Sequence, residues 1–129
     1  MADLGGAARI KVLVVEDEGI VRMTMVDFLE DAGFQVIEAA TGDDGLRELG
    51  ANPGIAALLT DIEMPGSVDG IRLASITHQM HPDAAVLVMS GRVRPSRSDL
   101  PPGARFFAKP YAHDQVIEAL HAMMSSKDI

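Results

Sequence analysis

Ala-Ala-Leu-Leu-Thr-Asp-Ile-Glu-Met-Pro-Gly, residues 56–66, is the stretch that decides the fold. Five uncharged residues lead to Asp61 and Pro65-Gly66 follows, so we predict a short buried strand that breaks into a loop. Such a strand places the Asp61 carboxylate at its carboxyl end, where open α/β sheets bind ligands. We therefore expect Asp61 to be a chemically used carboxylate, in preference to a helix cap or a solvated loop acid.

Working outward, strands and helices alternate five times along the chain. Apolar and β-branched runs predict strands over residues 10–15, 34–39, 56–61, 84–89 and 105–108. Helical spacing of apolar residues predicts helices over residues 19–32, 41–49, 70–81 and 113–124, with Val21, Met25, Phe28, Leu29 and Ala32 on the buried face of the first. Thr41 and Asp69 are expected as helix caps and Gly33 as a helix end. The alternation indicates a doubly wound parallel sheet covered by helices on both faces.

The segment 92–103 departs from this alternation. It contains Pro95, Pro101 and Pro102, and proline removes a backbone donor and clashes inside a helix. We expect at most one turn there, over residues 96–100, so the helix that would be the fourth of five, between the fourth and fifth strands, is shortened or missing.

Composition limits the protein to a few classes. A length of 129 residues predicts one domain, and the net charge of −8 argues against unspecific nucleic-acid binding. There is no Cys, which excludes disulfides and thiol chemistry and suits the cytoplasm. No apolar run approaches the roughly 20 residues of a membrane span, and residues 1–9 carry no secretory signal. We expect a cytoplasmic protein that binds neither membrane nor nucleic acid.

Polar side chains follow the predicted strands at the point where each strand ends: Glu16 and Asp17, Asp61, Ser90 and Lys109. In a parallel sheet these ends share one edge, although the sequence leaves the strand order open. Clustered carboxylates repel unless a cation intervenes, and oxygen ligands suit Mg²⁺. Asp is itself a nucleophile that forms aspartyl phosphate, with a lysine and a hydroxyl to hold phosphoryl oxygens. The parts fit phosphoryl transfer.

Five motifs in this order resemble the receiver domain of bacterial two-component response regulators, the chemotaxis-type, flavodoxin-like fold. They are Val-Leu-Val-Val-Glu16-Asp17, Leu-Thr-Asp61-Ile-Glu-Met-Pro65-Gly, Asp69-Gly70, Met-Ser90-Gly91 and Phe-Phe-Ala-Lys109-Pro110-Tyr. They cover residues 10–125, which we expect to be the receiver domain, between a flexible arm at 1–9 and a tail at 126–129.

The resemblance implies a role for each site residue. Asp61 would be the phosphoacceptor, supplied by a histidine kinase or a histidine phosphotransfer protein. Asp17, Asp61 and the backbone carbonyl of Glu63 would bind Mg²⁺, with Glu16 acting through water. Ser90 and Lys109 would hold the phosphoryl oxygens, Phe106 would be the aromatic switch together with Ser90, and the Lys109–Pro110 bond would be cis.

Three departures from the family pattern matter. Glu16 stands where the family more often has Asp, which keeps the charge, so we expect metal binding to survive. Phe106 has no hydroxyl, so a switch there works by packing. The proline-rich segment replaces most of the fourth helix, which puts the usual dimer mode in doubt.

Other interpretations of single residues stay open. Asp17 alone is a possible N-cap of the first helix, Ser90 suits capping of the following turn, and Lys109 suits the surface. His78 and His81 lie three apart on a helix, a spacing that holds zinc, but no further ligands accompany them. His113 and His121 are expected at the surface, as are the clustered arginines Arg92, Arg94, Arg97 and Arg105.

We expect a stand-alone receiver, a signalling switch that catalyses only its own phosphoryl transfer and dephosphorylation. One alternative is a binding module that is never phosphorylated. The other is a small phosphatase with Asp61 as nucleophile, for which neither a second, general acid nor a substrate cap is evident in 129 residues.

Overall fold

The computed structural model describes residues 9–127 and contains one five-stranded parallel sheet. The strand order is β2-β1-β3-β4-β5, and every neighbouring pair is parallel. The strands are β1 (Lys11–Val15), β2 (Gln35–Ala39), β3 (Ile55–Asp61), β4 (Ala85–Ser90) and β5 (Arg105–Ala108). This is the predicted flavodoxin-like sheet. The predicted arm, except residue 9, and the last two residues of the predicted tail lie outside the described residues.

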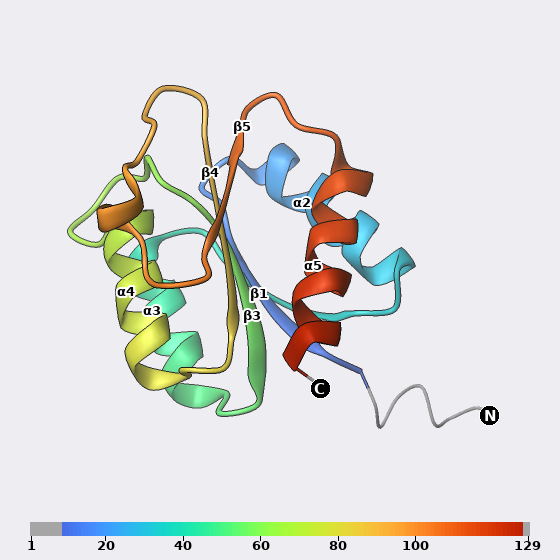
Figure 1. Ribbon diagram of the computed structural model, residues 1–129. Coiled ribbons are helices and arrows are strands. Elements are labelled where there is room, and N and C mark those ends of the chain that lie inside the picture. The colour runs from blue at the N-terminus through green and yellow to red at the C-terminus, as the bar shows by residue number, and fades with distance from the viewer. Residues whose placement is uncertain (1–8, 128–129) are drawn as a thin grey trace.

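Four helices cover the sheet, two on each face (Figure 1). Helices α2 (Gly19–Asp31) and α5 (His113–Lys127) lie on one face, and α3 (Gly42–Ala51) and α4 (Gly70–Met80) lie on the other. Strand residues therefore alternate between two apolar clusters. Val12, Val14, Leu59 and Leu87 face the first pair of helices. Leu13, Val15, Leu58, Val86 and Val88 face the second pair.

The central strands are apolar throughout because both of their faces are covered. Strand β4 is buried at all six positions, and β3 is buried at six of its seven. This pattern is typical of parallel sheets packed between helices. It places the last residue of β3, Asp61, at the end of a strand with no exposed face.

Two of the predicted caps hold α3 and α4 in place. The Thr41 hydroxyl accepts a hydrogen bond from the backbone N–H of Asp44 at 3.0 Å. The Asp69 carboxylate accepts one from the backbone N–H of Arg72 at 2.9 Å. Gly33 follows α2 with a positive φ of 96°, a conformation that glycine adopts without steric cost. These three local predictions are confirmed.

The predicted buried face of α2 is wrong in one respect. Phe28 is 44% exposed and stacks on His113, with ring centroids 4.4 Å apart and planes at 6°. Val26 is buried in its place, beside Met25 and Leu29. The helix packs against α5 as well as the sheet, and this second contact rotates its buried face away from the simple apolar stripe.

The proline-rich segment between β4 and β5 forms a single 3-10 turn, η1 (Arg97–Asp99), and no longer helix. The prediction of at most one turn in this segment is confirmed. Ser96 precedes the turn, and its backbone N–H donates to Asp99 Oδ2 at 2.9 Å. Leu100 and Ala104 pack against the second apolar cluster and cover part of the sheet there. Along residues 9–127, no helix combines the length and apolarity that a membrane crossing requires.

Candidate functional site

The candidate site lies at the carboxyl ends of β1, β3 and β5. Glu16 follows β1 directly, Asp61 ends β3, and Lys109 follows β5. Strands β1 and β3 are neighbours although β2 lies between them in sequence, so the chain reverses its direction of travel across the sheet at this point. Such a switch point opens a crevice where α/β sheets bind ligands.

Three acids meet in this crevice. A carboxylate oxygen from each of Glu16, Asp17 and Asp61 lies within 4.8 Å of the other two. Glu16 and Asp61 are buried, with 6% and 7% of their surface exposed, whereas Asp17 is exposed. Asp17 is not the N-cap of α2, because Glu18 occupies that position. The Asp17 side chain is therefore not engaged as a helix cap.

Lys109 is the cation of the site. Its Nζ lies 3.4 Å from Glu16 Oε1 and 3.4 Å from Asp61 Oδ2. The Lys109–Pro110 bond is cis, as predicted. The Lys109 amine, which follows β5, thus bridges the two buried carboxylates at the ends of β1 and β3.

The electrostatics of the site reflect burial first and neighbours second. Burial raises the pKa of Asp61, with Lys109 opposing and Glu63 and Asp17 adding to the rise. Burial likewise raises the pKa of Glu16. Burial alone lowers the pKa of Lys109, but the carboxylates of Asp61 and Glu16 outweigh it, so that the Lys109 pKa is raised. A single amine only partly offsets the cost of ionising two buried acids.

The donor set suits a hard divalent cation. Asp61 Oδ1 is buried and has no hydrogen-bond partner among the described residues, a condition that polar atoms seldom tolerate. The neighbouring ligand atoms are carboxylate oxygens, with neither thiol nor imidazole in the cluster. Hard cations such as Mg²⁺ and Ca²⁺ prefer this chemistry. A cation would supply the partner that Oδ1 lacks.

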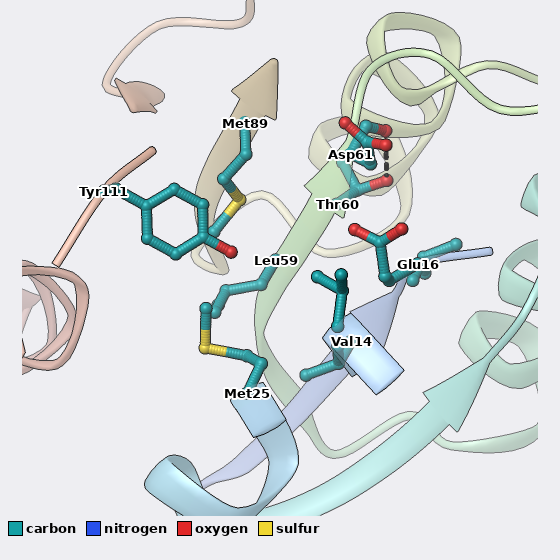
Figure 2. A pocket seen from close by; sticks show the side chains of 10 residues that line it. Val14, Glu16, Met25, Leu59, Thr60, Asp61, Met89 and Tyr111 are labelled. Carbon is teal, nitrogen blue, oxygen red and sulfur yellow. Dashed lines mark hydrogen bonds between the residues drawn. The ribbon is translucent and has the colours of Figure 1, made fainter. Parts of the chain in front are cut away.

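An apolar wall lies beside the acids (Figure 2). Figure 2 shows the Tyr111 ring facing Met89 and Leu59, with Met25 and Val14 completing the wall. The Thr60 hydroxyl donates to the backbone carbonyl of Asp61 at 2.9 Å, which ties the end of β3 internally. These apolar side chains are part of the surroundings in which Glu16 and Asp61 are buried, and burial raises the pKa of both carboxyls.

Ser90 ends β4, next to β3, and its hydroxyl donates to Glu63 Oε2 at 2.5 Å. The same Ser90 oxygen accepts from the backbone N–H groups of Arg92 and Val93, so it also caps the following turn. The family resemblance implied a role for Glu63 only through its backbone carbonyl, and the contact of its carboxylate with Ser90 was not predicted. The sequence showed only an acid two residues after Asp61 and a hydroxyl at the end of a later strand, and no local pattern joins the two.

The remaining candidates lie away from the acids. Phe106 is partly buried on β5, pairs with Val88, and packs against the apolar cluster under α3 and α4. His81 Nε2 lies 3.4 Å from the Leu49 carbonyl. In the described part of the chain, the cluster of three acids is the only group of three or more potential metal ligands, and it contains neither His78 nor His81. His113, expected at the surface, is half-buried against Phe28. The four arginines of the segment 92–105 are exposed.

Comparison with known proteins identifies the family of the chain. A family model described as the response regulator receiver domain matches residues 12–121. The chain is 30% identical over 118 residues to the response regulator receiver protein CpdR of Brucella abortus, covering 88% of this chain and 96% of CpdR. It is 35% identical to the sensor kinase CckA of the same organism over 98% of this chain, which spans only 13% of that kinase.

Solved structures share the fold. A response regulator receiver protein from Sinorhizobium medicae superimposes with a TM-score of 0.89 at 24% identity, covering 94% of this chain and 98% of that one. The receiver domain of the hybrid histidine kinase CckA gives a TM-score of 0.77 at 30% identity, covering 88% and 98%. The first establishes the fold, and the second adds sequence similarity.

Proposed function

The chain belongs to the response regulator receiver domain family, and from that premise we propose that it is a phosphorylation-controlled signalling switch with Asp61 as the phosphoacceptor. Receiver domains are signalling modules of two-component systems, which separates this chain from classical enzymes. The observation that carries the proposal is the placement of Asp61, buried at a strand end, between Lys109 and two further acids. Glu16 has similar neighbours, but its second carboxylate oxygen accepts the backbone N–H of Glu18, whereas Asp61 Oδ1 has no partner among the described residues.

In the proposed reaction, an Asp61 carboxylate oxygen attacks the phosphorus of a phosphohistidine. The P–N bond breaks, the histidine nitrogen keeps the electron pair and takes up a proton, and an aspartyl phosphate forms. Lys109 Nζ, which bridges Asp61 and Glu16, holds one phosphoryl oxygen after transfer. The Ser90 hydroxyl holds a second one.

The residues that would hold Mg²⁺ are Asp17, Asp61 and the backbone carbonyl of Glu63, with Glu16 acting through water. When bound, the ion neutralises charge on the transferring phosphoryl group. The unpartnered, buried Asp61 Oδ1 and the oxygen-only donor set support this assignment. Burial of Glu16 beside Lys109 suits an indirect role, since its carboxylate is already paired.

Further proposals concern the phosphoryl donor, the stand-alone role of the chain and the surface that a partner would bind. A histidine kinase or histidine phosphotransfer protein would supply the phosphoryl group, and similarity to the receiver of the hybrid histidine kinase CckA supports this class of donor. A stand-alone role is supported by CpdR, a receiver protein of which this chain covers 96%. Movement of Ser90 and repacking of Phe106 would then alter a partner-binding face.

Incubation with acetyl phosphate and Mg²⁺, followed by intact mass measurement, tests the acceptor. We expect an adduct of about 80 Da on the wild type, the mass of one phosphoryl group, and none on Asp61→Asn. Lack of the adduct, or its persistence in Asp61→Asn, would contradict the proposal. Steady hydrolysis of a phosphate ester beyond one equivalent would instead favour a phosphatase, and partner binding indifferent to phosphorylation would favour a constitutive binding module.

A further inference from the structure

The Glu63 carboxylate occupies the Ser90 hydroxyl, one of the two groups proposed to hold phosphoryl oxygens. Glu63 lies two residues after Asp61, and its Oε2 accepts the Ser90 hydroxyl at 2.5 Å. Ser90 is buried at the end of β4, so water competes little for this hydroxyl. A side chain of the protein therefore already holds the group assigned to the phosphoryl oxygen.

The same carboxylate oxygen also anchors the segment that follows β4. The backbone N–H of Val93 lies 3.0 Å from Glu63 Oε2 and 2.8 Å from Ser90 Oγ. Glu63, Ser90 and the turn at residues 91–93 form one closed hydrogen-bonded network. The network joins the loop after β3, which carries Glu63, to the proline-rich segment between β4 and β5.

A serine hydroxyl has one proton, so it donates to Glu63 or to a phosphoryl oxygen, but not to both. Both acceptors are anionic, and hydrogen bonds to anions are stronger than neutral ones. The negative charge of Glu63 also raises the pKa of Asp61, and the same charge would repel a phosphoryl group transferred to Asp61. The two anions thus exclude one another from Ser90.

We propose that the Glu63 carboxylate is a built-in competitor of the phosphoryl group for the Ser90 hydroxyl and holds the turn at residues 91–93 in its unphosphorylated arrangement. This inference rests on the proposed role of Asp61. Glu63 is a positioning residue in this scheme, because it acts through Ser90. Phosphorylation breaks the Glu63–Ser90 bond, and the turn at residues 91–93 loses an anchor as a direct result.

Binding of beryllofluoride, a non-covalent phosphoryl mimic, measures this competition in the presence of Mg²⁺. Titrations are followed by the amide NMR signals of Val93 and its neighbours. We expect Glu63→Ala to tighten binding about tenfold, the equivalent of one hydrogen bond to a charged group, and Glu63→Gln to lie between it and the wild type. Glu18→Gln is the matched control, since it removes an exposed nearby charge that does not contact Ser90.

A double-mutant cycle with Ser90→Ala separates hydrogen bonding from charge. In the Ser90→Ala background, Glu63→Ala should tighten beryllofluoride binding much less than in the wild-type background, because only the charge repulsion by Glu63 remains to be removed. Equal tightening in both backgrounds would show repulsion alone and would overturn the proposal. An unchanged affinity of Glu63→Ala in the wild-type background would also overturn it.

Amide hydrogen exchange tests, without any phosphoryl mimic, whether Glu63 holds the turn at residues 91–93 in place. Glu63→Ala should speed exchange of the Val93 amide severalfold, whereas Glu18→Gln should leave it unchanged. Wild-type protein that binds no beryllofluoride and gains no mass from acetyl phosphate would overturn the proposed function and this inference together. Wild-type binding without coupling between Glu63 and Ser90 would overturn this inference alone.

Discussion

Lys109 Nζ lies 3.4 Å from Asp61 Oδ2, although 48 positions separate the two residues in the chain. The pair exists because β3 and β5 are parallel strands of one sheet, so their carboxyl ends lie at the same edge, with only β4 between them. Glu16 shares the same amine at the same distance. Lys109 is therefore a structural counter-ion for two buried acids as well as the proposed phosphoryl ligand.

Replacement of Lys109 by Met should destabilise the domain at neutral pH. The substitution keeps an apolar stem but leaves Glu16 and Asp61 without their cation. We expect a loss of about 1–2 kcal/mol in the free energy of unfolding, between the values for exposed and buried ion pairs. Urea unfolding at pH 7 measures it, with Arg94→Met as control for an exposed arginine that makes no ion pair in the described region. Equal losses in the two variants would contradict this role.

Asp61→Asn should stabilise the metal-free domain. Burial raises the pKa of Asp61 in the folded state, so the stability linked to this group is complete below its unfolded pKa and is lost as the pH rises through the folded pKa. Asn removes this loss, and the Tm of the variant should exceed that of the wild type at pH 7. The difference should shrink as the pH falls through the raised, folded-state pKa of Asp61, where the folded carboxyl takes up its proton. Thermal melts in a chelating buffer decide this, and a lower Tm for Asn at pH 7 would refute it.

Mg²⁺ should stabilise the wild type through the three acids. A ligand at a hundredfold excess over its Kd adds about 2.7 kcal/mol to the free energy of unfolding. We expect most of this gain to disappear in Asp17→Asn, whose carboxylate belongs to the acidic cluster, and to persist in Glu18→Gln. Thermal melts with MgCl₂ and with EDTA measure the gain. Equal gains in the two variants would remove Asp17 from the site.

Gly70→Ala should disturb the site through packing. A Cβ at this position would collide with the backbone carbonyl of Asp61 and lie 2.7 Å from Cα of Ile62. We expect a loss of about 1–3 kcal/mol and weaker phosphorylation, because the end of β3 must move. Gly50→Ala, also in a helix but with open space at Cβ, should gain up to about 1 kcal/mol from helix propensity. Urea unfolding and acetyl phosphate labelling of both variants compare the two effects.

Much of the fold followed from local patterns. Apolar runs located all five strands to within one residue at each end, and the prolines near residue 100 limited that segment to one turn. Helix ends were less certain, since α5 continues to Lys127 beyond the predicted 124. The exposure of Phe28 was missed because His113, its stacking partner, is 85 positions away in the chain.

The candidate site divides in the same way. Glu16, Asp17, Asp61, Ser90 and Lys109 were identified as residues at strand ends. Their roles in phosphoryl transfer remain predictions for the experiments above. The Glu63 carboxylate was missed, because its hydrogen bond to Ser90 depends on how two loops meet beyond adjacent strands.

The amino-acid sequence by itself determined which segments are strands, where each one ends, and which polar residue stands at each end, because these follow from local apolar periodicity and backbone chemistry. Only the tertiary structure decided that β1 and β3 are neighbours, that Lys109 bridges two acids, and that Glu63 holds Ser90. These contacts join residues far apart in the chain. Their geometry comes from the packing of two helix layers on one twisted sheet, which no local pattern encodes.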